Sequence, residues 1–394
     1  MDKPIIVKPN LRPPCGCPAT VIGLHSNKVP VTGIPAVRTP GASARKAKRP
    51  AQWVRGMCIW LGLLSTAVAA TPDPLFTDHT PLDISLTAPF STIDRDRDKD
   101  AEYGGSLSYV AAGGETVTLE VTLQVRGNFR LRTDICRYSQ LWVDFRRRQT
   151  QGTIFENQNR IKLVVQCRSG DRYQEFIAKE HQAYQMYKQL SDLSLDTRLA
   201  NTTFVDSESS ESRTSLTMFI EHQRRLSERS GLAEVEENTV LRSSLHPEQA
   251  SMVALFMMMI GNTDFSLVAG PPDEECCHNA KLLVDEQGAF HPVPYDFDIS
   301  GFVNAAYAPE PDPSLGIRNN RQRLFRGYCD QNDSLAAAIT RFNQAREAVM
   351  DIAASEVLVS SRTASQSSDY LEDFFELIND PRQLERDILR RCRG

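Results

Sequence analysis

The segment PVPYDFDISG, residues 292–301, places two aspartates one residue apart, on either side of Phe297. Asp296 and Asp298 follow a short apolar run and precede a glycine. Carboxylate oxygens in such a place suit a divalent cation such as Mg²⁺ or Mn²⁺. They equally suit a turn whose carboxylates accept hydrogen bonds from backbone amides. Other residues of the chain indicate which of the two interpretations applies.

Two elements lead into this segment. AKLLVDEQGAFHPVPYDF, residues 280–297, is typical of a short hairpin that turns at Gln287–Gly288. HPEQASMVALFMMMIGN predicts a helix from Pro247 to residue 260, with methionines filling its core face. Asp264 follows this helix and Asn279 precedes the hairpin. Both therefore lie at element ends near Asp296, although Asp264 equally fits a cap of the helix end.

The first half of the mature chain predicts a sheet. Residues 116–240 contain five candidate strands, the first of which alternates apolar and polar residues, with one helix over residues 172–191. Residues 241–394 are mainly helical, with helices near 333–356, 368–379 and 381–391. Residues 71–115 are polar, and DRDRDKDAEYGG within them is typical of a solvated charge run. The expected fold class is α+β, an antiparallel sheet with packed helices.

Glu180 lies on the apolar stripe of the helix over 172–191, at i+3 and i+4 spacing from Ile177 and Tyr184. A carboxylate on a buried helix face is costly unless it is paired. Lys162, inside the apolar segment IKLVV, is the expected partner. Alternatively, Glu180 lies at the margin of the stripe and contacts water.

Several motifs carry a family resemblance: VRGNFR at residues 125–130, RIKLVV, GNTD, HN and PVPYDFD. Through them, residues 116–302 resemble the CotH-type atypical protein kinases of spore coats. The chain is similar, more closely, to an uncharacterised group of exported bacterial proteins with RGNFR, CCHN and PVPYDFDISG-like segments. The CotH-type resemblance implies a two-lobed protein-kinase-like fold. Its antiparallel-sheet N-lobe would span residues 116–240, and its mainly helical C-lobe residues 241–394.

The resemblance also implies phosphorylation of protein Ser/Thr with ATP and a divalent metal (Mg²⁺ or Mn²⁺). It assigns Asp264 as the catalytic residue, and Asn279 and Asp296 as metal ligands. Asp298, the second carboxylate of the turn, is the third metal candidate. The cofactor-binding candidates are Lys162, Glu180, Arg126, Gly127 and Asn128.

Two features depart from the pattern of that family. Fifteen residues separate Asp264 from Asn279, and no GxGxxG phosphate loop is present. We expect metal- and nucleotide-dependent phosphoryl or nucleotidyl transfer to a protein or small hydroxyl acceptor. The alternatives are a catalytically silent envelope binding or structural protein and, third, a metal-dependent hydrolase that uses the aspartate pair.

The N-terminus predicts export. Residues 1–56 are basic and proline-rich, either a disordered arm or an artefact of the start site, and MCIWLGLLSTAVAA at 57–70 is typical of a signal peptide. We expect cleavage near Ala70, with a retained signal anchor as the alternative, and no stable membrane span in the mature chain. The whole chain carries −5, and residues 1–56 contribute +9, so the remainder carries −14. That charge disfavours nucleic acid as a partner.

Six cysteines follow the signal segment, which in an exported chain predicts up to three disulfides with fifteen possible connectivities. Cys136 and Cys167 would meet if their strands pair. A zinc site built from CCHN at residues 276–279 is the rival interpretation. The segment RNNRQRLFRGYC, residues 318–329, is a basic island. It either balances neighbouring acids or binds an anionic substrate.

Overall fold

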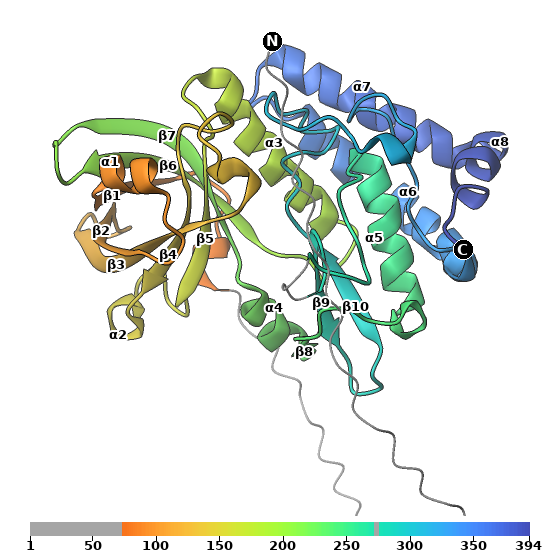
Figure 1. The fold of residues 1–394 in the computed structure, drawn as a ribbon, viewed down its shortest axis with the longest axis horizontal. Coiled ribbons are helices and arrows are strands. Elements are labelled where there is room, and N and C mark those ends of the chain that lie inside the picture. The colour runs from red at the N-terminus through yellow and green to blue at the C-terminus, as the bar shows by residue number, and fades with distance from the viewer. Residues whose placement is uncertain (1–72, 272–275) are drawn as a thin grey trace, which may run out of the picture. The chain divides into compact units, whose positions relative to one another are not determined.

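The computed structural model describes residues 73–271 and 276–394, which all belong to one compact unit. The predicted leader, signal segment and cleavage site at residues 1–70 lie outside the described residues. The described chain forms a β-barrel followed by a mainly helical region (Figure 1).

Seven strands close into a barrel in the order β1-β2-β3-β4-β5-β7-β6. Neighbouring strands are antiparallel, except that β6 closes the barrel on β1 in parallel, with Leu82 opposite Ala200. The strands are β1 (Leu82–Ala88), β2 (Glu102–Val110), β3 (Thr116–Arg126), β4 (Gln140–Phe145), β5 (Arg160–Val165), β6 (Thr197–Asp206) and β7 (Ser212–Ile220).

The predicted two-lobed protein-kinase-like fold with an antiparallel-sheet N-lobe is therefore wrong. A closed barrel has no free sheet edge, and its closing pair is parallel. The physical reason lies in residues 71–115, whose polar composition favours a solvated segment. They supply β1 and β2, and the apolar residues of β1, such as Ile84 and Leu86, are buried in the barrel core.

The pairing of β1 with β2 depends on a glycine. A Cβ atom at position 105 would lie 2.5 Å from the carbonyl oxygen of Thr87 in β1. Only glycine permits this approach of two backbones. The charge run begins in the last turn of α1 (Phe90–Asp96) and is more than solvated surface, because the Arg97 guanidinium donates to the carbonyl oxygens of Leu131 and Cys136.

The first long helix of the helical region lies in the sequence between two barrel strands, β5 and β6. Helix α3 (Asp171–Lys188) contacts β6 and β7 on one side and α6 on the other. The apolar helix α5 (Pro247–Ile260) and the hairpin of β9 (Ala280–Val284) and β10 (Phe290–Pro294) have the predicted positions. The remaining elements are α2 (Arg147–Thr150), α4 (Gln223–Ser230), β8 (Ala233–Glu234), α6 (Asn332–Ala354), α7 (Ser361–Asn379) and α8 (Pro381–Leu384).

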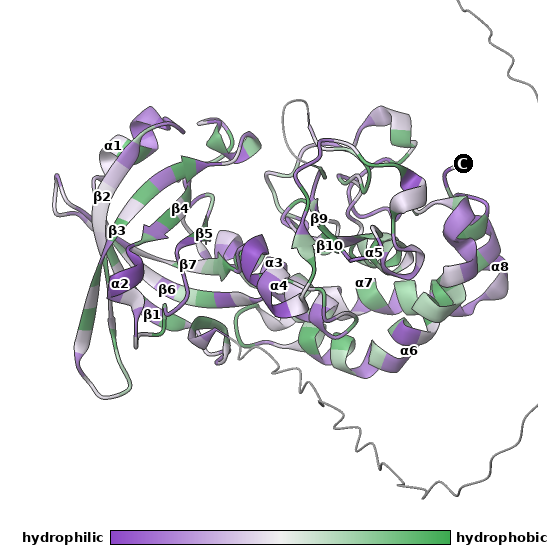
Figure 2. Cartoon of the chain, turned by 90° about the horizontal axis from the view of Figure 1, so that it is seen from below, coloured by the Kyte–Doolittle hydropathy of each residue, from purple (hydrophilic) through white to green (hydrophobic). Residues whose placement is uncertain are grey.

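Helices α6 and α7 pack on each other and on α5. In Figure 2 both ribbons carry hydrophobic and hydrophilic residues. Their buried faces include Phe342 of α6 and Phe374 of α7, whose rings are 5.6 Å apart between centroids. The helices thereby form a second hydrophobic core, separate from the core of the barrel.

Three disulfides join the six cysteines of the described chain: Cys136–Cys167, Cys276–Cys277 and Cys329–Cys392. The disulfide prediction is confirmed, including the pairing of Cys136 with Cys167. The zinc interpretation of CCHN is wrong, because both of its cysteines are consumed by a disulfide. Disulfides are compatible with an exported chain. Within residues 73–271 and 276–394, no helix has the length and apolar character that crossing a membrane requires.

Candidate functional site

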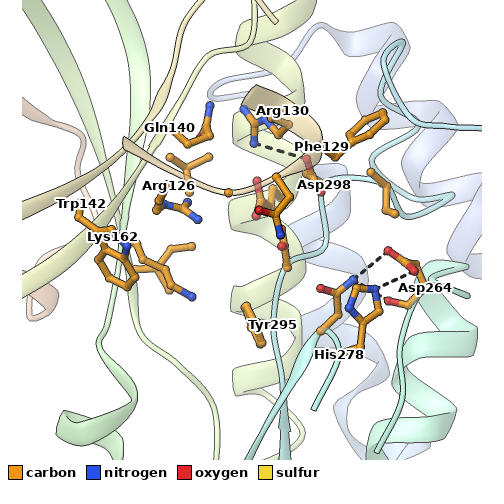
Figure 3. Close-up of a pocket in the computed structure, with 18 of the residues that line it drawn as sticks. Arg126, Phe129, Arg130, Gln140, Trp142, Lys162, Asp264, His278, Tyr295 and Asp298 are labelled. Carbon is orange, nitrogen blue, oxygen red and sulfur yellow. Dashed lines mark hydrogen bonds and ion pairs between the residues drawn. The ribbon is translucent and has the colours of Figure 1, made fainter. Parts of the chain in front are cut away.

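A cavity of about 730 Å³ is lined by the outer face of the barrel on one side and by α3, the hairpin and its flanking loops on the other (Figure 3). The cavity brings together every site residue that the sequence predicted. These residues are Arg126, Gly127, Asn128, Lys162, Glu180, Asp264, Asn279, Asp296 and Asp298.

Strand register builds the barrel wall of the cavity. Gln124 of β3 lies opposite Trp142 of β4, Trp142 opposite Lys162 of β5, and Lys162 opposite Ile220 of β7. Side chains alternate between the two faces of a strand, and neighbours such as Leu163 fill the barrel interior. The side chains of these four paired residues therefore lie on the outer face of the barrel, and all four line the cavity.

Lys162 is a cation in a poorly hydrated place. Its Nζ lies 5.6 Å from the centroid of the Trp142 ring and 4.3 Å from that of Tyr295. The surrounding protein lowers the pKa of Lys162 to about 7, because burial removes water and the charges of Arg126 and Lys281 add repulsion. An anionic ligand would restore the charged form.

The RGN element ends β3 at the rim of the cavity. Gly127 adopts φ +89°, a left-handed conformation that glycine takes without steric cost. Asn128 accepts a hydrogen bond of 2.9 Å from the Lys99 ammonium. The Nε atom of Arg126 is buried without a hydrogen-bond partner, and burial lowers the pKa of this guanidinium.

Arg130, four residues further on, holds Asp298. Its guanidinium lies 3.4 Å from the Asp298 carboxylate and donates a 2.6 Å hydrogen bond to the Val165 carbonyl oxygen. Tyr307 also hydrogen-bonds Asp298. Burial, and then the charge of Asp296, raise the pKa of Asp298 to about 6. Asp298 is thus oriented by the protein and is less available to a metal than Asp296.

Glu180 is buried on α3, with 2% of its surface exposed, which excludes the water-contacting alternative. The predicted ion pair with Lys162 is wrong: within the described residues no such contact forms, and Oε2 of Glu180 has no hydrogen-bond partner. Burial, and then the charges of Asp298 and Asp296, raise the pKa of Glu180 well above its usual value. The protonation of Glu180 is therefore coupled to the charges of the two aspartates in the turn.

Asp296 is held through its backbone. Its N–H donates a 2.9 Å hydrogen bond to the Tyr184 hydroxyl, and its φ of +63° is left-handed. Among the described residues, no backbone amide donates to the carboxylate of Asp296 or Asp298. The interpretation of the turn as an amide-capping structure is therefore wrong.

Asp264 is half-exposed and has two side-chain partners. His278 Nε2 lies 2.8 Å from its Oδ1, and the Asn279 amide donates to its Oδ2 at 3.2 Å and to its carbonyl oxygen at 2.5 Å. Figure 3 shows these contacts on the side of the cavity away from Lys162. Asn262 accepts a hydrogen bond of 3.0 Å from the Asp264 N–H, so the side chain that caps this loop is that of Asn262.

Three arginines of the basic island at residues 318–329 bind backbone carbonyl oxygens of the protein itself. Arg323 donates to the carbonyl oxygens of Met259 and Tyr370, and Arg326 donates to that of Thr263. Arg321 lies 3.4 Å from the carbonyl oxygen of Gly301. Arg326 thereby holds the residue before Asp264, Arg323 contacts α5 and α7, and none of the three guanidiniums lines the large cavity.

Sequence reasoning missed Arg130, Trp142, Lys281 and Tyr295, and it left His278 out of the site. Arg130 was already within the quoted VRGNFR segment. The position of Trp142 depends on which strands pair, so no local pattern indicates it. His278 adjoins Asn279, and this adjacency to a candidate ligand was the available signal.

Within the described residues, no group of three or more His, Cys, Asp or Glu side chains is arranged to hold a metal ion by itself. No protein-family model matches the chain, and no curated protein shows significant similarity to it. The resemblance to the CotH-type kinases stays a prediction.

Proposed function

We propose that the protein transfers a phosphoryl or nucleotidyl group from a nucleotide to a hydroxyl acceptor, with a divalent metal ion. One observation carries the proposal: a single cavity brings carboxylates together with six cationic side chains, and within the described residues only Arg130 and Arg160 of these six form an ion pair. The cations that line it are Lys99, Arg126, Arg130, Arg160, Lys162 and Lys281, and the acids are Glu180, Asp264, Asp296 and Asp298.

The cationic excess in this cavity contrasts with the acidic chain around it. Six basic side chains against four acids favour an anionic ligand, whereas the chain as a whole carries −5. A nucleotide polyphosphate has the required charge, and positioning and charge stabilisation are the main contributions a protein makes to phosphoryl transfer. Lys162, Arg126 and the RGN rim are the groups we assign to it.

The carboxylates fit a divalent cation. Burial and mutual repulsion raise the pKa of Glu180 and Asp298, and Oε2 of Glu180 is buried without a partner. A cation relieves such crowding. Mg²⁺ typically takes one or two carboxylates and shares its other positions with water and phosphate, so it does not need a cage of three protein acids. Asp296 and Asn279 would hold it, and when bound it would neutralise charge on the phosphates.

Asp264 is the group we assign to the acceptor hydroxyl. It is half-exposed, and Asn279 and His278 fix its orientation through the contacts described above. A positioned carboxylate of this kind orients a hydroxyl and accepts its proton. Asn262 holds the backbone of the same residue, because its side-chain oxygen accepts a hydrogen bond from the Asp264 N–H.

Calorimetric titration of the full chain with ATP tests the proposal, with and without Mg²⁺ or Mn²⁺. We expect saturable binding that requires the metal, followed by ADP or pyrophosphate release when hydroxyl acceptors are added. Asp369→Asn, an exposed position on α7, serves as a matched control. Saturable binding without any turnover would instead favour a silent binding protein, and absence of binding would refute the proposal.

A further inference from the structure

A second lysine reaches the cavity from the wall opposite Lys162. Lys281 lies in β9, two residues after Asn279, and lines the cavity. Its Nζ is 5.6 Å from the centroid of the Tyr295 ring, while Nζ of Lys162 is 4.3 Å from the same centroid. One lysine belongs to the barrel and the other to the hairpin, so a ligand between them contacts both.

The two ammonium groups are close enough to repel each other. Because both lie near one ring centroid, their nitrogens are at most the sum of 4.3 and 5.6 Å apart. That separation is within a Debye length of about 10 Å at 0.1 M salt. Within the described residues, no carboxylate forms an ion pair with either lysine. Glu180 and Asp296 line the same cavity but do not pair with these lysines, so two like charges that lack an ion-pair partner favour the binding of an anion between them.

A third donor faces the same space. Arg126 lines the cavity, and its buried Nε has no hydrogen-bond partner. Ammonium and guanidinium groups have only donors, so this group of three residues is suited to acceptor oxygens that carry negative charge. Donors that come from two walls and span several ångströms match an extended polyanion better than a single phosphate.

We infer that Lys281 is a second phosphate-binding lysine, which together with Lys162 and Arg126 holds the polyphosphate of the donor between the barrel and the hairpin. The inference rests on the proposed function and adds to it. Lys281 makes the cavity selective for triphosphates over monophosphates, because only a longer chain of phosphates contacts cations on both walls. It also joins the two walls when the donor is bound.

Inorganic tripolyphosphate, pyrophosphate and orthophosphate are the probes, titrated calorimetrically into the full chain without metal. We expect affinity to fall in that order. Lys281→Gln should weaken tripolyphosphate binding on the order of tenfold to a hundredfold, the effect of losing one charge-assisted contact. Lys281→Arg should restore most of it. Lys188→Gln, a partly exposed lysine paired with Asp196 outside the cavity, should bind like the parent.

The outcomes separate the inference from the proposed function. If Lys281→Gln binds tripolyphosphate and Mg–ATP as the parent does, the inference is overturned and the proposed function stands. If tripolyphosphate binding depends on Lys281 but no group transfer occurs, the inference stands and the transfer proposal fails. If the parent binds neither ATP nor tripolyphosphate, both fail.

Discussion

The carboxylates lie on one wall of the cavity, beside Lys281, and the other cations lie mainly on the barrel wall; the two walls differ in how their charges are paired within the protein. On the carboxylate wall, Asp264 contacts His278 and Asn279, and Asp298 contacts Arg130. On the barrel wall, no described carboxylate forms an ion pair with Lys162. The first wall is already organised by the protein, whereas the second has cationic charge left for a ligand.

This difference separates two kinds of charged residue. A charge that is buried and paired contributes to stability, and removing its partner is costly. A charge that is partly desolvated and unpaired destabilises the fold, and it is compensated when an oppositely charged ligand binds. Substitution of a paired charge and substitution of an unpaired charge should therefore have opposite effects on stability, and the predictions below test the assignments on which that contrast depends.

The largest expected effect is on turnover. Asp264→Asn should reduce the rate of transfer by about 10²- to 10⁴-fold, because the amide cannot accept the proton of the acceptor hydroxyl. Binding of Mg–ATP should remain close to that of the parent. ADP release and calorimetry measure the two quantities, with Asp369→Asn as the control. Equal turnover in Asp264→Asn and the parent would remove Asp264 from the reaction.

The second effect concerns the paired wall. Arg130→Met should lower the free energy of unfolding by about 3–5 kcal/mol, because it leaves the buried Asp298 carboxylate without its cation. Urea unfolding measures the change. A double-mutant cycle with Asp298→Asn isolates the pair. Arg390→Met, which breaks a largely exposed pair with Glu385, should cost less than about 1 kcal/mol. A coupling energy near zero would show that the Arg130 pair contributes nothing.

The third effect is smaller and concerns the turn. Asp296→Asn should abolish the metal-dependent rise in melting temperature, which at a metal concentration of 100 Kd corresponds to about 2.7 kcal/mol in the parent. Asparagine is the appropriate substitution because it tolerates the left-handed φ of +63°, whereas alanine would add backbone strain. The metal-free protein should melt at the same or a higher temperature, since crowding of the carboxylates is relieved. Thermal melts with and without Mg²⁺ test this, and a lower metal-free melting temperature would make Asp296 a structural residue.

The smallest effect concerns the unpaired wall. Lys162→Met should raise the free energy of unfolding at neutral pH by on the order of 1–3 kcal/mol, because no ion pair is lost and a desolvated cation is removed. The pKa of Lys162 is about 7 in the folded protein against 10.5 as its ordinary value. Between these pH values the unfolded chain binds the additional proton, so this residue makes the parent more stable as pH rises from 7 to 10.5.

Urea unfolding at pH 7 and pH 9 compares the parent with Lys162→Met. The increase in stability between the two pH values should be smaller in the variant. Lys188→Met, which breaks a contact with Asp196, should leave the increase unchanged. A loss of several kcal/mol in Lys162→Met would instead restore the ion-pair interpretation of this residue.

Local patterns in the sequence predicted individual elements well. Pro247 at the start of α5 and Gly261 after its end bound a helix whose limits were predicted, because both residues act through backbone conformation alone. The turn of the β9–β10 hairpin at Gln287–Gly288 is of the same kind, since Gly288 has φ +82°. Such signals need no knowledge of the rest of the fold.

Barrel closure was not predictable in this way. The alternation of LDISLTA was present in β1, but the neighbouring charge run and the glycines of β2 hid the pair of strands. Whether β1 pairs in parallel with β6 depends on contacts between residues more than a hundred positions apart, such as Leu82 and Ala200. Local propensity carries no information on such pairing.

The sequence by itself determined which chemical groups the candidate site contains, because carboxylates, amides and cations at element ends can be read from residue types and turn signals. Only the tertiary structure decided which of them pair. Glu180 and Lys162 share the cavity without an ion pair, and Arg130, rather than Lys162, holds a buried carboxylate. The physical reason is that an ion pair depends on distances of a few ångströms between separate elements, and those are set by strand register and by the packing of α3 against the barrel.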